Sequence, residues 1–210
     1  MHKSTKESQS SMTPAQAQRL LEDGNGRFCS GEQSGRDLRK RVAETGGGQW
    51  PFAAVLCCID SRVPPELVFD QGIGDIFSVR IAGNVVNDDI VGSLEFSCKV
   101  AGARLIVVLG HERCGAVMGA CDDVKLGKLS GLLERIAPAI EATELSPEQT
   151  CRDSTNGDFV QAVALNNVRM AAASILEQSD VLQAMVSAGE VEVVCAMYGI
   201  KSGEVTFLDR

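Results

Sequence analysis

Histidine is scarce in this chain, whose 210 residues include only His2 and His111. His2 lies in a polar segment at the start, so His111 is the only histidine in the body of the protein. It follows the apolar run RLIVVLG and precedes Cys114 by three residues, in the stretch GHERC. Any chemistry that requires an imidazole therefore centres on residue 111, and the body of the chain offers no second histidine to relay protons.

Long hydrophobic runs are also lacking. The longest purely aliphatic run, LIVVL at 105–109, is far shorter than the roughly 18 to 20 apolar residues of a membrane-spanning helix. The opening segment MHKSTKESQSSM is polar and lacks the apolar stretch of a secretory signal peptide. We therefore predict a disordered leader over residues 1–12 and no membrane partner.

An excess of basic charge is absent as well. The chain has 28 acidic residues against 20 lysines and arginines, which gives a net charge of −8. Its densest basic segment, RDLRKR at 36–41, is more typical of a solvated helix face or a subunit contact than of a phosphate-binding surface. We expect no nucleic-acid partner.

Cysteine, by contrast, is frequent, with eight residues spread through the chain. Several lie in apolar runs, where a small buried hydrophobe is the ordinary role. Without an export signal the reducing cytoplasm is the expected location, and thiols or metal ligands are expected there rather than disulfides. The eight are Cys29, Cys57, Cys58, Cys98, Cys114, Cys121, Cys151 and Cys195.

The order of apolar segments predicts an α/β fold. Continuous apolar runs, typical of strands buried on both faces, alternate with segments of helical periodicity. We expect a central, mainly parallel sheet of about four strands with a C-terminal antiparallel strand and helices on both faces. Residues 13–210 form one domain in this interpretation, and 13–48 form an N-terminal helical arm that packs on a partner subunit. The predicted strands cover 52–59, 76–82, 104–110 and 191–200, and the segment EVTFL adds the last one.

Two of the predicted strands end in residues that carry chemistry, and such sheets bind ligands beyond the carboxyl ends of their strands. One end reads CCIDSR and supplies Cys57, Cys58, Asp60 and Arg62, while the other supplies the histidine and cysteine of GHERC. Successive strand residues point to opposite faces, so only one of the adjacent cysteines can face the site. A cysteine, a histidine and a second cysteine match a catalytic zinc site with an open fourth position. A catalytic thiol with a histidine base, and simple core packing, remain possible from the residues alone.

The two motifs together resemble the β-class carbonic anhydrases. The chain reads Cys58-Ile59-Asp60-Ser61-Arg62, followed some fifty residues later by His111-Glu112-Arg113-Cys114, with GSLEF and VVLGH between them. The resemblance implies a Zn²⁺ ion, one per chain, held by Cys58, His111 and Cys114, with Asp60 and Arg62 as a catalytic pair beside it. Zinc-bound hydroxide would hydrate carbon dioxide reversibly to bicarbonate and a proton. Asp60 is also a possible fourth zinc ligand in a closed state.

The resemblance extends to a substrate pocket and an assembly. It implies substrate-binding roles for Gln49, Phe77, Phe96 and Gly115, with Phe96 often lent by a neighbouring subunit, in a homodimer or homotetramer whose sites lie near the interface. Some bacterial members carry a tryptophan of an inhibitory bicarbonate pocket at the position of Val55, so a plant-type site without that pocket is expected. Hydrolysis of carbonyl sulfide or carbon disulfide, or a non-catalytic zinc-binding role, stay open as alternatives.

Overall fold

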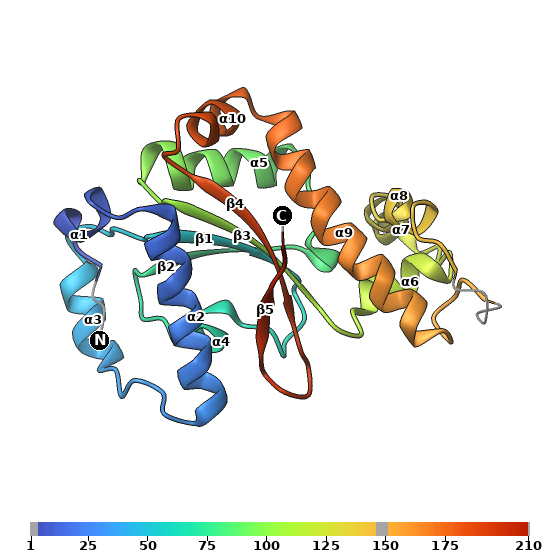
Figure 1. The fold of residues 1–210 in the computed structure, drawn as a ribbon, viewed down its shortest axis with the longest axis horizontal. Coiled ribbons are helices and arrows are strands. Elements are labelled where there is room, and N and C mark those ends of the chain that lie inside the picture. Colours follow the sequence, from blue (N-terminus) through green and yellow to red (C-terminus); the bar gives the residue numbers. More distant parts are fainter. Residues whose placement is uncertain (1–3, 146–150, 210) are drawn as a thin grey trace.

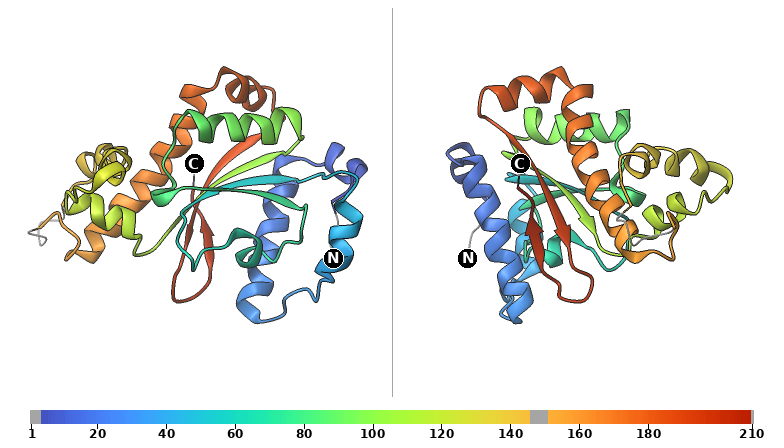
Figure 2. Two further views of the ribbon diagram at one scale, coloured as in Figure 1. Left: turned by 180° about the vertical axis from the view of Figure 1, so that it is seen from behind. Right: turned by 45° about the vertical axis from the view of Figure 1, so that its right-hand side comes forward.

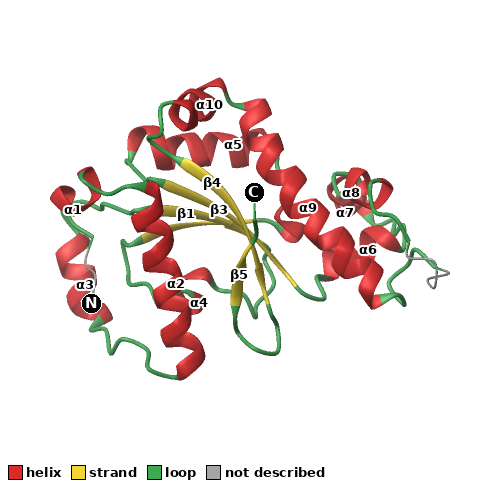
Figure 3. Ribbon diagram, viewed as in Figure 1, coloured by secondary structure: helices red, strands yellow, loops and turns green. Residues whose placement is uncertain are grey.

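A computed structural model describes residues 4–145 and 151–209. Its centre is a five-stranded mixed sheet in the order β2-β1-β3-β4-β5 (Figures 1 and 3). The first four strands are parallel, and β5 pairs antiparallel with β4. The predicted α/β architecture is therefore confirmed. The strands are β1 (Ala53–Cys57), β2 (Ile76–Arg80), β3 (Leu105–His111), β4 (Glu192–Tyr198) and β5 (Val205–Phe207).

The central strands β1 and β3 are buried along their whole length because helices cover both faces of the sheet. Alternate residues of each strand belong to two separate apolar cores. On β1, Ala54 and Leu56 pack into one core, whereas Val55 and Cys57 pack into the other. Cys58 continues the alternation and belongs to the first core, so the two adjacent cysteines face opposite ways.

The first core is covered by α5 (Asp88–Glu95), α9 (Gly157–Gln178) and α10 (Asp180–Ser187). A π-helical turn, Phe96–Val100, extends α5 without a break. The long helix α9 packs across β3 and β4 (Figure 1). By length and composition alone α9 is apolar enough to cross a membrane, but half of its most apolar window is buried inside the protein.

The second core lies beneath α2 (Pro14–Ser30) and α4 (Pro65–Val68), which cover the opposite face of the sheet (Figure 2). Thr13 caps α2, because its side chain accepts from the Gln16 N–H while the Gln16 side chain returns to the Thr13 backbone. The side chain of Asn25 then joins α2 to the end of α4 and to the start of β5. It donates to the carbonyls of Val68 and Gly203 at 3.0 and 2.8 Å, and it accepts from the Val205 N–H at 2.8 Å.

Residues 1–3 of the predicted disordered leader (1–12) lie outside the described residues, and in the rest of it Lys6–Ser10 form a helix, α1. Thr5 and Ser8 make a capping box at its start. The buried Gln9 side chain donates to the carbonyls of Pro51 and Ala101, both at 2.7 Å. These two contacts join the leader to the start of β1 and to the segment before β3. Because Pro51 and Ala101 are far from Gln9 in the sequence, the residues around Gln9 give no signal of these contacts.

The remaining helices lie at the two ends of the sheet. Figure 1 shows α3 (Leu38–Thr45) beside α1, and α6 (Gly115–Cys121), α7 (Gly127–Leu133) and α8 (Ala137–Glu141) grouped beyond the carboxyl end of β3. The parallel strands thus direct their carboxyl ends toward α6, and the chemistry-bearing motifs follow them there.

Candidate metal centre

Three buried side chains meet where β1 and β3 end. These strands are neighbours, with Cys57 opposite Leu109, so the residues that follow each strand emerge at the same edge of the sheet. Cys58 comes directly after β1, His111 ends β3, and Cys114 sits at the N-cap of α6. The two sulfurs and a ring nitrogen of the histidine all lie within 4.8 Å of one another. The structure therefore brings together the three predicted metal ligands.

The geometry and chemistry of these donors suit zinc. The Sγ atoms of Cys58 and Cys114 are 3.9 Å apart. Two sulfurs in a tetrahedral site, each about 2.3 Å from zinc, lie about 3.8 Å apart. Nδ1 of His111 is 2.9 Å from the carbonyl oxygen of Glu112, and donating its N–H there leaves the Nε2 lone pair facing the sulfurs. That buried Nε2 has no hydrogen-bond partner among the described residues, and a bound metal would satisfy it.

The two clustered thiols are linked by a hydrogen bond that shifts the pKa of each. A hydrogen bond from the Cys114 thiol, assisted by His111 and by the Gly83 N–H, lowers the pKa of Cys58 against the opposing effect of burial. The same hydrogen bond, together with burial, raises the pKa of Cys114. Burial raises the pKa of Cys57 to about 12, which fits an inert thiol in the core on the other face. Cys58, not Cys57, is the cysteine of this strand that can bind a metal.

Asp60 lies beside the cluster and is held by Arg62. The guanidinium of Arg62 donates Nε–H to Oδ1 at 2.9 Å and Nη2–H to Oδ2 at 2.8 Å, a bidentate pair. This pairing holds the pKa of Asp60 well below its ordinary value. Oδ2 of Asp60 is 4.0 Å from Nε2 of His111. In this structure the carboxylate thus faces Arg62 at the mouth of the site and is not one of the three clustered ligands.

Several supporting contacts were not foreseen from the sequence. Arg80, at the end of β2, donates to the carbonyls of Cys58 and Asp60 at 3.1 and 2.7 Å and fixes the backbone between them. The Gly83 N–H donates to Cys58 Sγ at 3.3 Å. The Glu112 carboxylate accepts from the Ile200 N–H at 3.2 Å and anchors the turn after β3. Only the contacts of Arg80 had a signal in the sequence, namely an arginine at the end of the strand that neighbours β1.

The four predicted pocket residues lie at different distances along the chain from the clustered ligands. Gln49 is exposed and precedes β1, whereas Cys58 follows it, and five strand residues at about 3.3 Å each separate the two. Phe77 lies in the amino half of the edge strand β2 and packs edge-to-face against Phe96, with ring centroids 6.3 Å apart. Both line a cavity of about 720 Å³ beside β2. Gly115, in contrast, directly follows Cys114 at the first position of α6, with open space at its Cα.

Val55, the position expected to distinguish a plant-type site, is fully buried. It lies between Ser78 of β2 and Val107 of β3 and packs in the core beneath α2. The strand therefore uses this position for packing.

The chain is similar to known carbonic anhydrases along most of its length. The sequence profile of the carbonic anhydrase family matches residues 53–205. Carbonic anhydrase 2 of Mycobacterium tuberculosis is 32% identical over 203 residues, 94% of each chain. Among solved structures, a β-carbonic anhydrase of Coccomyxa superposes with a TM-score of 0.71 at 22% identity, covering 82% of this chain and 78% of that one. A β-carbonic anhydrase of Sordaria macrospora, described as tetrameric, gives 0.68 at 20% identity over 82% and 91%. At such identities the structural matches speak for the fold alone.

Proposed function

Because the chain belongs to the β class of the carbonic anhydrase family, whose members interconvert carbon dioxide and bicarbonate, we propose that it does so at a zinc ion held by Cys58, His111 and Cys114. Residues 13–210 act as one catalytic domain in this proposal. The observation that carries it is the convergence of two buried sulfurs and one unpartnered imidazole nitrogen at the ends of neighbouring strands.

The chain's own residues prepare the site for this reaction. When bound, zinc supplies a Lewis acid that makes water a nucleophile near neutral pH. Asp60, kept ionised by Arg62, would accept a hydrogen bond from such a water through a carboxylate oxygen and so orient it toward carbon dioxide. The carbonyl of Glu112 holds the ring of His111 in the tautomer that presents Nε2. Since two thiolate ligands would neutralise the charge of a bound ion, activation of the water would depend strongly on the Asp60 carboxylate.

The metal assignment is tested by the Cys58→Ser variant. We expect wild-type protein to contain one zinc per chain by elemental analysis, and we expect the variant to lose the metal and the hydration activity together. Cys57→Ala is the matched control, because this neighbouring thiol faces the opposite core and should leave the zinc content unchanged. Full zinc content in Cys58→Ser would refute the ligand set.

The substrate is tested by comparing carbon dioxide hydration with sulfide release from carbonyl sulfide and carbon disulfide, using zinc-loaded protein. We expect hydration to dominate. Preferential sulfide release would instead assign a sulfur substrate, and the loss of both activities from zinc-loaded protein would assign a non-catalytic role.

We also propose a homo-oligomer, a dimer or tetramer, with the sites near subunit interfaces. The support is the exposed face of α3. Arg41 holds α3 against its own chain, donating to Asp75 Oδ1 at 2.7 Å and to the Ile73 carbonyl at 2.9 Å, whereas Leu38 and Val42 are 53% and 57% exposed. Two exposed aliphatic side chains one helical turn apart are suited to contact a second subunit. The Sordaria relative is described as tetrameric.

For its location we propose the cytoplasm. All eight cysteines lie within the described residues, and each is a free thiol there, which suits a reducing compartment. Cell fractionation that places the enzyme with secreted or membrane proteins would contradict this assignment. We propose no nucleic-acid or membrane partner.

A further inference from the structure

One backbone residue between β2 and α5 connects the metal centre to the distant helix α9. The Gly83 N–H donates to Cys58 Sγ at 3.3 Å, and the Gly83 carbonyl accepts from Nδ2 of Asn167 at 2.8 Å. All three residues are buried. Two hydrogen bonds, one on each side of the Gly83 Cα, therefore relate the sulfur of a proposed metal ligand to an asparagine that lies far away in the sequence.

Gly83 is confined to its position by packing as well as by conformation. Its φ is +67°, in the left-handed region that favours glycine. A Cβ there would approach Cδ1 of Ile136 to 2.8 Å and Cβ of Ala116 to 3.2 Å. Packing thus limits how far the backbone can move. The hydrogen bond from Asn167 restrains the peptide group that follows Gly83, whose Asn84 N–H also donates to the Ile81 carbonyl at 3.0 Å, and a turn held on this side leaves the Gly83 N–H little freedom to turn away from the sulfur.

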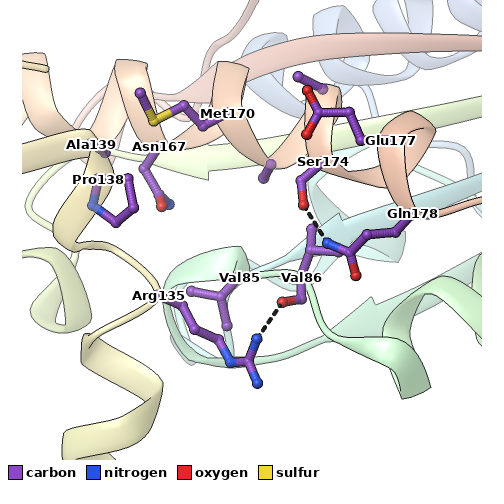
Figure 4. Close-up of a pocket in the computed structure, with 12 residues that line it drawn as sticks. Val85, Val86, Arg135, Pro138, Ala139, Asn167, Met170, Ser174, Glu177 and Gln178 are labelled. Carbon is purple, nitrogen blue, oxygen red and sulfur yellow. Dashed lines mark hydrogen bonds between the residues drawn. The ribbon is translucent and has the colours of Figure 1, made fainter.

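Asn167 is suited to this task because its side chain has little freedom. It projects from α9 toward the segment that carries Val85 and Val86, beside a cavity of about 390 Å³ that also receives Arg135 (Figure 4). Arg135 donates to the Val86 carbonyl at 3.3 Å and so binds the same segment further along. Asn167 is the residue on this wall that reaches the Gly83 carbonyl.

We propose that Asn167 is a positioning residue of the metal centre, which holds the Gly83 N–H against the Cys58 sulfur and thereby fixes the orientation and donor strength of that ligand. The inference rests on the proposed zinc site. Residues that orient metal ligands in this way typically change metal affinity on the order of 10- to 100-fold when they are replaced.

The test compares Asn167→Leu with Asn166→Leu. Asn166 is the adjacent residue of α9, and its Nδ2 donates to Thr143 Oγ1 at 2.8 Å, so its loss removes a hydrogen bond of the same kind that does not lead to the metal. Zinc affinity is measured by competition with a chelator, and the Co²⁺-substituted proteins are compared by their thiolate-to-cobalt charge-transfer absorption. Asn167→Asp, which keeps the shape but loses the donor when ionised, serves if the leucine variant does not fold.

We expect Asn167→Leu or Asn167→Asp to weaken zinc binding by roughly 10-fold or more and to shift the charge-transfer band. Asn166→Leu should retain the wild-type affinity and band, whatever its effect on the unfolding temperature. Unchanged affinity and spectrum in the Asn167 variants, or equal changes in both positions, would overturn the proposal. Wild-type protein that binds no zinc would overturn it together with the proposed function, whereas zinc binding without hydration would overturn the function alone.

Discussion

At the scale of single residues, the pairing of Asp60 with Arg62 keeps the Asp60 carboxylate ionised. The bidentate contact lowers the pKa of Asp60, so its carboxylate stays ionised from neutral pH down to well below its ordinary pKa of about 3.9. Since the folded-state pKa is lowered, the stability that this contact contributes is present above the unfolded-state pKa. It is lost only as the pH falls through the folded value.

Replacing the carboxylate without changing its shape tests its role. We expect Asp60→Asn to lower kcat/KM for carbon dioxide hydration on the order of 100-fold or more. The neutral amide oxygen accepts a weaker hydrogen bond from the water than the negatively charged carboxylate does. Zinc content should stay at the wild-type level, since Asp60 is not among the clustered ligands. A variant with wild-type activity would remove Asp60 from the mechanism.

The lowered pKa of Asp60 gives a second prediction, which concerns pH. The ratio of wild-type to Asp60→Asn activity should remain constant between about pH 6 and 9, because the carboxylate does not titrate in this window. The measurement is the pH profile of kcat/KM for both proteins. A ratio that declines toward one below neutral pH would show that Asp60 takes up a proton there, contrary to its pairing with Arg62.

At the scale of elements, α2 packs closely against the end of α4 because Gly24 has no side chain at the contact. A Cβ on Gly24 would overlap the carbonyl oxygen of Phe69 and lie 2.8 Å from its carbon, whereas a Cβ on Gly26 would meet nothing within 4 Å. We expect Gly24→Ala to destabilise the protein by about 1 to 3 kcal/mol through this clash. Gly26→Ala, two residues further along the same helix, should stabilise it by up to about 1 kcal/mol.

Urea denaturation of the two variants measures both effects, with Gly26→Ala as the control for the change in helix propensity. Equal free energies of unfolding for Gly24→Ala and Gly26→Ala would mean that α2 does not approach α4 as closely as the structure has it.

The elements that the sequence predicted are those whose signals are local. The apolar runs of β1 and β3 follow from residues within a few positions of each other. Parallel neighbours that end at one edge of a sheet predicted that one of the two adjacent cysteines would meet His111 and Cys114, and the family resemblance then selected Cys58 as the ligand. The helix α1 was missed because Gln9 finds its partners more than forty residues away. Asn167 was missed for the same reason, since 84 positions separate it from Gly83.

At the scale of the whole molecule, α3 presents two aliphatic side chains to solvent. Leu38 and Val42 lie four residues apart, on one face of the helix, and are 53% and 57% exposed. They form a small apolar surface that a second subunit would cover.

Charge placed on this surface should separate the subunits. We expect the double variant Leu38→Glu/Val42→Glu to have a lower molar mass by light scattering than wild type, because like charges would face each other across the interface. Leu126→Glu is the control, since this exposed leucine precedes α7, at the opposite end of the molecule from α3 (Figure 1). Retention of the wild-type mass by the double variant would exclude α3 from the interface.

The wide sequence spacing of the metal ligands has a consequence for biosynthesis. Cys58 and Cys114 are 56 residues apart, so at about 5 to 20 residues per second the ribosome adds the second sulfur roughly 3 to 11 seconds after the first. During most of that interval the nascent chain contains Cys58 but neither His111 nor Cys114. Asn167 is made later still. The three proposed ligands therefore exist together only after residue 114 of 210 has been added, so the metal site cannot be completed before more than half of the polypeptide has been translated.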